Sequence, residues 1–218
     1  MHDLIIRQTH MTVPVGTIYC LGKNYEKHIR EMGGAGPTPP VIFIKPRTAL
    51  VRPGGIVHRP AISSEMHHEV ELVAVIGKKG KGIPEDEAMD HIQGFAIGVD
   101  LTLRDVQAVA KQRGEPWAVA KGFDGSAPVS EVLVRTEIPD PQDLTLRLSV
   151  NGKVRQEGST RDMILTVPGV IAYLSTIFTL EPGDCVFTGT PEGVGPVEPG
   201  ETIRAEIVGH IAAEWNVA

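Results

Sequence analysis

The stretch His68-Glu69-Val70-Glu71-Leu72-Val73-Ala74-Val75-Ile76 places two carboxylates inside a run that is otherwise apolar. The run predicts a strand over 69–76 that is buried rather than exposed. Because side chains alternate across a strand, Glu69 and Glu71 project to the same face. Asp100 follows a second apolar run, which predicts a strand over 95–99. Strands set side by side in this way can bring all of these carboxylates to one point.

Buried carboxylates that meet at one point repel one another and carry a large desolvation cost. A divalent cation between them removes both penalties, and an all-oxygen ligand set suits Mg²⁺, Mn²⁺ or Ca²⁺ rather than Zn²⁺. The alternative is that Glu69 and Glu71 face solvent from an edge strand, but their apolar neighbours argue against an exposed edge. His68 alternates to the opposite face and is not included. We therefore expect Glu69, Glu71 and Asp100 to bind a divalent metal ion.

The composition is that of an ordinary globular protein, with 218 residues of which 41% are hydrophobic and 22% charged. A net charge of −6 argues against general affinity for nucleic acid, which needs a basic face. No apolar stretch reaches the roughly 18 residues of a membrane span, and the N-terminus lacks a secretory pattern. Cys20 and Cys185 each lie in an apolar run, so we expect reduced core residues. These features predict a cytoplasmic protein without nucleic-acid or membrane partners.

Many short elements are expected, because 24 glycines and 17 prolines are scattered along the chain. The expected strands are 15–21, 41–44, 69–76, 95–99, 144–150, 153–156, 184–188, 202–207 and 211–215. The dipeptide Asn151-Gly152 between two of them is typical of a type I′ hairpin turn. Strands outnumber helices and do not alternate with them, which indicates an α+β fold with mostly antiparallel sheets rather than a doubly wound fold. We expect one catalytic domain over 1–218.

A few short helices complete the predicted structure. They are expected at 24–32, at 84–91, from residue 102 onward, and at 167–178. Asn24 is a plausible cap of the first, and Thr166 of the last, which has Pro168 in its first turn. Thr102 and Asp105 together form a pattern similar to a capping box, which favours a helix beginning at Thr102.

His28 and Glu31 are three residues apart on a predicted helix and so share one face. A carboxylate beside an imidazole orients the ring and stabilises its protonated form, which is the arrangement a general base needs. The alternative is a surface pair on a solvated helix. The glycine-rich stretch 33–37 that follows fits a mobile lid over a ligand, and it fits a plain loop equally well.

Basic and polar residues close to Asp100 in the sequence could contact an anionic ligand. Arg104 and Gln107 share a helix face, and Lys121 follows in the segment Ala120–Asp124. Arginine suits a carboxylate, although solvated charges explain the same spacing. The stretch 188–196, which contains Thr190, has three glycines that let a backbone approach a ligand, but it could also be an ordinary turn. Neither a Gly-x-Ser-x-Gly elbow nor a zinc-type spacing of Cys and His is present in the sequence.

Taken together, these segments resemble the fumarylacetoacetate hydrolase family from Tyr19 onward. The matching runs are Cys20–Tyr25, Pro40–Pro46, His68–Leu72, Gly98–Asp100, Pro116–Trp117 with Lys121–Asp124, and Gly189–Gly195. The resemblance implies a mixed β-sandwich roll, a homodimer, and Mg²⁺ or Mn²⁺ at the carboxylates, with Ca²⁺ as a possible substitute in crystals. The chain lacks the extra N-terminal domain of fumarylacetoacetate hydrolase itself, which makes fumarylacetoacetate an unfavourable substrate.

Within that family the chain is similar to acylpyruvate hydrolases and related oxaloacetate decarboxylases. The resemblance implies that His28 and Glu31 form a lid dyad, that Lys121 takes part in catalysis, and that Arg104, Gln107 and Thr190 contact a small 2-oxo acid substrate. The expected reaction is hydrolysis of the C–C bond of a 2,4-dioxo acid to pyruvate and a carboxylic acid.

Two kinds of alternative stay open at the level of the sequence. On the same scaffold, the reaction could be oxaloacetate decarboxylation, or isomerase, decarboxylase or tautomerase chemistry on a 2-oxo diacid. In a different class, the carboxylates could form a non-catalytic Ca²⁺- or metabolite-binding module. The residues His28, Arg104 and Lys121 near the carboxylates favour an enzyme over such a module.

Overall fold

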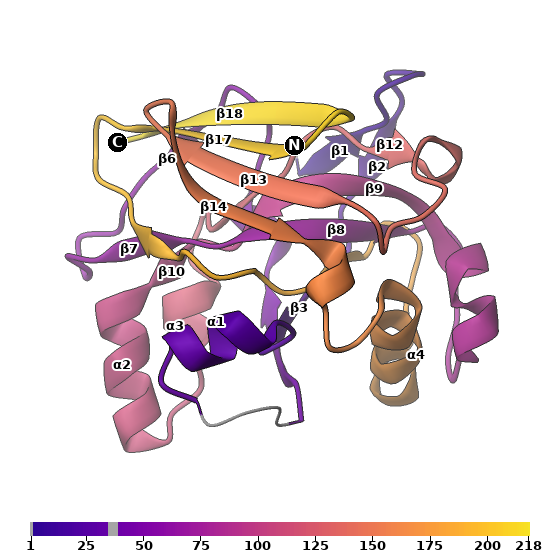
Figure 1. Ribbon diagram of the computed structural model, residues 1–218, viewed down its shortest axis with the longest axis horizontal. Helices are drawn as coiled ribbons and strands as arrows, with labels where there is room; N and C mark the ends of the chain where they lie inside the picture. Colours follow the sequence, from indigo (N-terminus) through magenta and orange to yellow (C-terminus); the bar gives the residue numbers. More distant parts are fainter. Residues whose placement is uncertain (1, 35–38) are drawn as a thin grey trace.

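Two sheets carry most of the strands in the structure, which is a computed structural model and describes residues 2–34 and 39–218 (Figure 1). The first has six strands in the order β12-β9-β8-β15-β3-β4. Its members are β3 (Ile18–Gly22), β4 (Val41–Lys45), β8 (Val70–Ile76), β9 (Ile92–Val99), β12 (Leu133–Val134) and β15 (Cys185–Phe187). Figure 1 shows it below the second sheet. The predicted strand over 15–21 begins only at Ile18.

The second sheet has five strands in the order β14-β13-β17-β18-β6. Its members are β6 (Ile56–Val57), β13 (Thr145–Val150), β14 (Lys153–Ser159), β17 (Thr202–Ile207) and β18 (Ile211–Val217). The predicted hairpin is confirmed, because β13 and β14 pair antiparallel and Asn151 and Gly152 both have positive φ, 50° and 76°.

Three small sheets surround these two. They contain β1 (Asp3–Ile5), β2 (Thr12–Pro14), β5 (Leu50–Val51), β7 (Met66–His68), β10 (Thr102–Leu103), β11 (Ala127–Pro128) and β16 (Gly195–Pro196). Most strand pairs are antiparallel, and the structure has the predicted α+β class.

The hydrophobic core lies on both sides of the six-stranded sheet. One cluster joins its upper face to the five-stranded sheet and includes Leu72, Ile97, Leu148 and Trp215. A second cluster on the opposite face includes Val73, Phe187 and Cys20. Every residue of β8 is buried, which explains why the run from which the strand was predicted is apolar apart from its glutamates. The cysteines are free and buried, as predicted.

The helices gather along one side of the strands (Figure 1). They are α1 (Glu26–Glu31), α2 (Arg104–Arg113), α3 (Ala118–Lys121) and α4 (Val167–Ile177), with short 3-10 helices at Arg47–Ala49, Glu85–His91, Arg135–Glu137 and Thr160–Asp162. The cap of α4 is confirmed, since Thr166 Oγ1 accepts a hydrogen bond from Gly169 N at 3.1 Å. None of the helices within 2–34 and 39–218 combines the length and apolarity that crossing a membrane demands.

Two predicted helix starts are wrong. Thr102 belongs to β10, and α2 begins at Arg104; Asp105 binds Ser63 and Ser64 instead of closing a capping box. Asn24 does not cap α1, whose N-cap is Tyr25. The Asn24 amide instead donates to Thr188 O at 2.8 Å and Leu165 O at 3.0 Å, so it joins distant segments. Asn24 and Asp105 therefore bind residues distant in the sequence instead of capping the neighbouring helices.

Candidate metal centre and active site

A cavity of about 350 Å³ opens where the end of β9 meets α1, α2 and α3. Eight of the nine predicted site residues line it: His28, Glu69, Glu71, Asp100, Arg104, Gln107, Lys121 and Thr190. The ninth, Glu31, contacts His28. Residues 35–38 of the predicted mobile stretch lie outside the described residues, whereas Gly33 and Gly34 line the cavity. The chain thus brings segments from across the sequence to a single site.

The pairing of β8 with β9 sets the position of the carboxylates. Val70 pairs with Val99 and Glu71 with Gly98, so Asp100 emerges beside Glu69, and Asp100 N donates to Glu69 O at 2.8 Å. A side chain at position 98 would fall 2.7 Å from the Phe187 ring, which explains the glycine there. Glu69, Glu71 and Asp100 are all buried, and one oxygen of each lies within 4.8 Å of the others.

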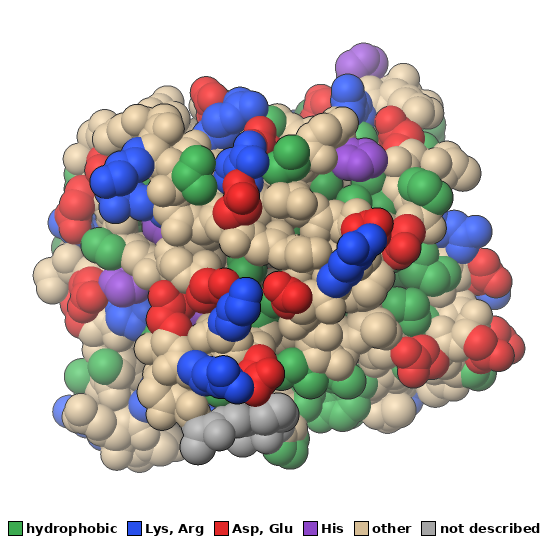
Figure 2. All heavy atoms as spheres, in the orientation of Figure 1, with side chains coloured by type: hydrophobic (Ala, Val, Ile, Leu, Met, Phe, Trp, Pro, Cys, Tyr) green, Lys and Arg blue, Asp and Glu red, His purple; other side chains and the backbone are tan. Residues whose placement is uncertain are grey.

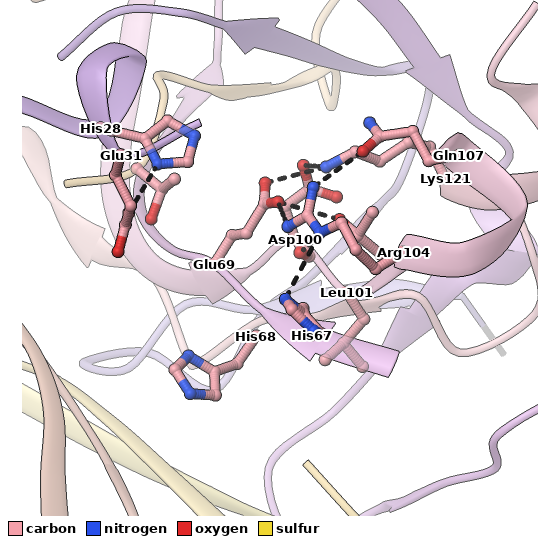
Figure 3. A network of polar contacts seen from close by, with 12 residues as sticks. His28, Glu31, His67, His68, Glu69, Asp100, Leu101, Arg104, Gln107 and Lys121 are labelled. Carbon is pink, nitrogen blue, oxygen red and sulfur yellow. Dashed lines mark hydrogen bonds and ion pairs between the residues drawn. The ribbon is translucent and has the colours of Figure 1, made fainter. Parts of the chain in front are cut away.

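Cationic side chains surround two of these carboxylates (Figure 3). Lys121 Nζ lies 2.8 Å from Glu69 Oε2 and 2.5 Å from Asp100 Oδ2. Arg104 Nη2 donates to Glu69 Oε1. Burial alone would raise the pKa of Glu69, but the charges of Lys121 and Arg104 outweigh burial and hold that pKa well below its usual range.

Glu71 is the carboxylate with the least compensation. Its Oε2 accepts a hydrogen bond from Gly189 N at 2.6 Å, and no ion pair to it is found among the described residues. Burial first, and then the negative charges of Asp100 and Glu69, raise the pKa of Glu71 well above its usual range. A divalent cation at the point of convergence would supply the missing positive charge. The donor set, three carboxylates without sulfur or imidazole, fits a hard ion such as Mg²⁺ or Mn²⁺.

Lys45, at the end of β4, is a member of the site that the sequence analysis did not find. Its side chain is fully buried, and Nζ forms an ion pair with Asp100 Oδ1 at 2.8 Å. The angles of this contact do not meet the criteria for a hydrogen bond. Nζ also donates to Leu101 O at 3.2 Å and to Lys121 O. A lysine at the end of the apolar run 41–44 was the available signal, because an isolated buried ammonium needs a carboxylate partner.

His28 and Glu31 are in contact, as their spacing predicted. His28 Nδ1 lies 3.3 Å from Glu31 Oε2, and Gly193 N donates to Glu31 Oε1 at 3.1 Å. Because a carboxylate can only accept, His28 must carry a hydrogen on Nδ1, which leaves Nε2 of the neutral ring as the proton acceptor. Figure 3 shows this pair on one side of Glu69 and Asp100, with Gln107 and Lys121 on the other.

Arg104 holds its neighbours in defined orientations. Nη1 donates to Gln107 Oε1 at 2.7 Å, so the NH₂ group is the end of Gln107 that stays available to the cavity. Nε donates to His67 Nδ1 at 3.4 Å, and His67 Nε2 in turn faces Glu65 Oε1 at 2.8 Å. Burial and the charge of Arg104 lower the pKa of His67, which favours the neutral ring that this pattern requires.

The glycine-rich turn after β15 donates its backbone N–H groups to protein carboxylates. Gly189 N binds Glu71 and Gly193 N binds Glu31. Both glycines have positive φ, and a side chain on Gly193 would fall 2.5 Å from Arg155 O. From the sequence, this stretch could have been either a ligand-binding turn or an ordinary turn. Its N–H groups fix one carboxylate of the cluster and one residue of the dyad.

A family model described as fumarylacetoacetate (FAA) hydrolase C-terminal matches residues 17–217. The chain belongs to the fumarylacetoacetate hydrolase family. It is 47% identical over 200 residues to the oxaloacetate tautomerase FAHD1 of Bos taurus and 48% identical to that of Arabidopsis thaliana, and each alignment covers 92% of this chain and 90% of the relative. Both relatives are named as mitochondrial.

Solved structures of this family share the fold. A fumarylpyruvate hydrolase from Pseudomonas aeruginosa, in complex with Mn²⁺ and pyruvate, is 40% identical with a TM-score of 0.95, covering 99% of this chain and 95% of the other. A 5-carboxymethyl-2-hydroxymuconate delta-isomerase from Mycobacterium smegmatis is 38% identical with a TM-score of 0.84, covering 95% and 80%. The fold is that of the fumarylacetoacetate hydrolase family, as the sequence predicted, and family members with this fold are named for more than one reaction.

Proposed function

We propose that the protein is a divalent-metal enzyme that hydrolyses the C–C bond of acylpyruvates, giving pyruvate and a carboxylic acid. One observation carries the proposal: His28, which contacts Glu31, and the three-carboxylate cluster face the same cavity. A cluster alone would serve a structural ion, and a dyad alone would serve many hydrolases. Their combination supports deprotonation of water beside a substrate whose 2-oxo acid end is held by a metal ion.

The charges in the site favour a dianionic substrate. Glu69, Glu71 and Asp100 contribute about −3, and the buried or partly buried cations Lys45, Arg104 and Lys121 offset them. A divalent ion then leaves an excess of roughly two positive charges, which suits a dicarboxylate. The carboxylates and the ion alone give about −1; Arg104 and Lys121 bring the sum to about +1, and Lys45 raises it to about +2.

Each residue has a role in the proposed reaction. Glu69, Glu71 and Asp100 would hold Mg²⁺ or Mn²⁺, which as a Lewis acid would stabilise negative charge on the 2-oxo acid end of the substrate. His28 takes a proton from water, and Glu31 holds the imidazolium that forms. The hydroxide adds to the C4 carbonyl, and Lys121 and Gln107 donate hydrogen bonds to the resulting oxyanion.

Collapse of that oxyanion breaks the C3–C4 bond. C4 leaves as a carboxylic acid, and the bonding electron pair stays on C3 as the enolate of pyruvate, which then takes a proton. Arg104 and Thr190 would contact the substrate carboxylates. The remaining N–H groups of Arg104 and the Thr190 hydroxyl are suitable donors, and both residues line the cavity.

The second candidate is tautomerisation of oxaloacetate, favoured by the 47–48% identity to oxaloacetate tautomerases. In that reaction His28 would move a proton between C3 and the 2-oxygen, and no water would be consumed. Oxaloacetate decarboxylation reaches the same enolate by loss of CO₂ and would need the ion but no general base. Isomerisation of longer unsaturated diacids is a further alternative on this scaffold.

One panel of assays separates these reactions. The Mg²⁺-loaded protein is given acetylpyruvate, fumarylpyruvate and oxaloacetate; pyruvate is measured with lactate dehydrogenase, CO₂ is measured separately, and the enol absorbance of oxaloacetate is followed. Pyruvate release from an acylpyruvate, lost on removal of the metal, is the expected result. Enol–keto exchange of oxaloacetate without pyruvate release from any acylpyruvate would overturn hydrolysis in favour of tautomerisation. No turnover of any compound would revive the non-catalytic alternative.

We propose that residues 1–218 form a single catalytic domain, that the protein is a homodimer, and that it works in the cytoplasm. Light scattering on a sizing column tests the dimer, which predicts about twice the chain mass of 23.5 kDa.

A further inference from the structure

Gln156, on β14 of the five-stranded sheet, lies behind the cavity and has polar contacts on both sides of its amide. The residue is 1% exposed. Its Oε1 lies 3.0 Å from Val70 N and 2.9 Å from His68 Nδ1. Its Nε2 lies 3.0 Å from Pro191 O and 2.9 Å from Thr190 Oγ1. Gln156 therefore links the start of β8, beside Glu69, to the turn that carries Thr190.

The orientation of this amide is fixed by its partners. The backbone N–H of Val70 can only donate, so the oxygen of Gln156 must face it. The carbonyl of Pro191 can only accept, so the nitrogen must face the turn. His68 is then required to donate from Nδ1.

The orientation of the amide sets the role of the Thr190 hydroxyl. Gln156 Nε2 donates to Thr190 Oγ1, which occupies an acceptor position of that oxygen. The hydroxyl hydrogen then needs an acceptor, and within the described residues its contact is Pro191 O at 3.4 Å, which is long for an O–H donor. Thr190 lines the cavity, so a ligand carboxylate there would be the better acceptor.

The backbone of the turn is also held closely against β14. A side chain at Gly158 would fall 2.4 Å from Pro191 Cβ, and one at Gly193 would fall 2.5 Å from Arg155 O. Glycine at both positions lets the turn and the strand approach each other directly. The position of Thr190 is thus set by the five-stranded sheet as well as by its own segment.

We propose that Gln156 is a positioning residue, which makes the Thr190 hydroxyl a hydrogen-bond donor to the carboxylate of the acidic substrate. The inference rests on the proposed function only in assigning the ligand as a carboxylate. Gln156 itself acts through Thr190.

The Gln156→Glu variant tests this directly, because glutamate keeps the acceptor for Val70 and His68 but loses both donors to the turn. Its carboxylate would accept from the Thr190 hydroxyl and turn that hydrogen away from the cavity. Pyruvate binding to the Mn²⁺-loaded protein, measured by calorimetry, should weaken roughly tenfold, as for the loss of one charge-assisted hydrogen bond. The KM for the substrate should rise similarly, with kcat changed less than about threefold.

A double-mutant cycle with Thr190→Val separates positioning from a general effect on charge or folding. Thr190→Val alone should also weaken pyruvate binding roughly tenfold, and in the Gln156→Glu background it should cost less than about twofold. Thr190→Ser should restore most of the affinity lost by Thr190→Val in the wild-type background only. Glu157→Gln, the next residue on β14 with an exposed side chain, serves as the matched control and should leave binding unchanged.

Equal losses for Thr190→Val in the two backgrounds would overturn the proposal, as would a failure of the Mn²⁺-loaded wild type to bind pyruvate. Mn²⁺ affinity, measured on every variant, should stay close to wild type. Thermal denaturation should stay close to wild type for the Thr190 and Glu157 single variants, whereas variants with Gln156→Glu should melt at a lower temperature, because the buried carboxylate faces Pro191 O. Pyruvate binding is measured without turnover, so the two proposals can fail separately. If the effects of Gln156→Glu and Thr190→Val on binding are coupled but the protein hydrolyses no acylpyruvate, the proposed function is rejected and the positioning role of Gln156 is supported.

Discussion

The backbone N–H of Gly193 donates a hydrogen bond to the carboxylate of Glu31 at 3.1 Å, and the same carboxylate contacts His28 Nδ1 at 3.3 Å. The dyad on α1 is therefore held by the turn that follows β15. Lys27 and Glu192 form a second contact between the same two segments, at 3.4 Å. This pair is largely exposed, so the Glu31 contact is the one that fixes the imidazole.

Gly193→Ala should lower acylpyruvate hydrolysis at least about tenfold. The added methyl would fall 2.5 Å from Arg155 O, in a backbone with φ of +94°, so the turn must move away from Glu31. Gly200→Ala is the matched control, because its φ is +91° but a side chain there meets nothing within 4 Å. Gly200→Ala should lose roughly 1 kcal/mol in urea denaturation because of its φ alone, and Gly193→Ala should lose more because of the added clash. Equal kcat values for the two would show that the Gly193 contact does not support the dyad.

His28→Ala should reduce acylpyruvate hydrolysis by at least about 10²-fold, the low end for loss of a general base. Oxaloacetate decarboxylation should fall much less, because loss of CO₂ needs no proton removed from water. Glu26→Gln, on an exposed part of the same helix, should leave both rates unchanged. The check is pyruvate release measured for both substrates with the three proteins. Hydrolysis unchanged in His28→Ala would remove the dyad from the mechanism.

Lys45→Met should destabilise the protein by about 3 kcal/mol, because Asp100 loses a buried cation while remaining in the same environment. For a chain of this length that corresponds to a drop in Tm of roughly 6–12 °C. Lys79→Met, which breaks an exposed pair with Glu181, should cost less than about 1 kcal/mol. Scanning calorimetry in excess EDTA measures both. A Lys45→Met protein as stable as Lys79→Met would refute the structural role of the buried pair.

Stability should decline at alkaline pH because of the two buried thiols. Burial raises the pKa of Cys185 to about 12 and raises that of Cys20 well above its usual value. The folded state therefore keeps protons that the unfolded state loses above about pH 8.5. Stability from this source is complete below that pH and falls as pH rises toward 12, by about 2 kcal/mol per thiol at pH 10.

Urea denaturation under reducing conditions at pH 7.5 and pH 10 tests whether stability falls with rising pH and whether the thiols cause the fall. Between these two pH values, the free energy of unfolding should fall by about 2 kcal/mol less in Cys185→Ala than in the wild type. The comparison within each protein cancels the cost of the cavity that alanine creates. An identical decrease in the two proteins would show that Cys185 does not cause the pH dependence.

The features predicted correctly from the sequence are those that depend on local patterns. The apolar run around Glu69 and Glu71 specified a buried strand and, through alternation, a shared face. Asn151-Gly152 specified a turn with two positive φ angles, and Thr166 capped its own helix. In each case the residues that form the structure are neighbours in the chain, so their spacing carried the information.

The features that were missed depend on contacts between distant segments. Asn24 binds Leu165 and Thr188, some 140 and 164 residues away, and no local pattern distinguishes that role from capping. Lys45 and Gln156 likewise meet their partners only in the folded chain. Charges of both signs are interspersed over the face shown in Figure 2, so the surface gives no simple guide to the site. Without Lys45, the positive charge of the site is underestimated by one unit.

The central claim is that Glu69, Glu71 and Asp100 bind one divalent metal ion per chain. Anomalous diffraction from a crystal soaked in Mn²⁺ tests it most directly, with a Glu71→Gln crystal treated identically beside it. We expect one strong anomalous peak within about 2.3 Å of an oxygen of each carboxylate in the wild type, and a greatly weakened peak in the variant. A wild-type crystal with no peak among these oxygens, and with Lys121 still joined to Glu69 and Asp100, would contradict it.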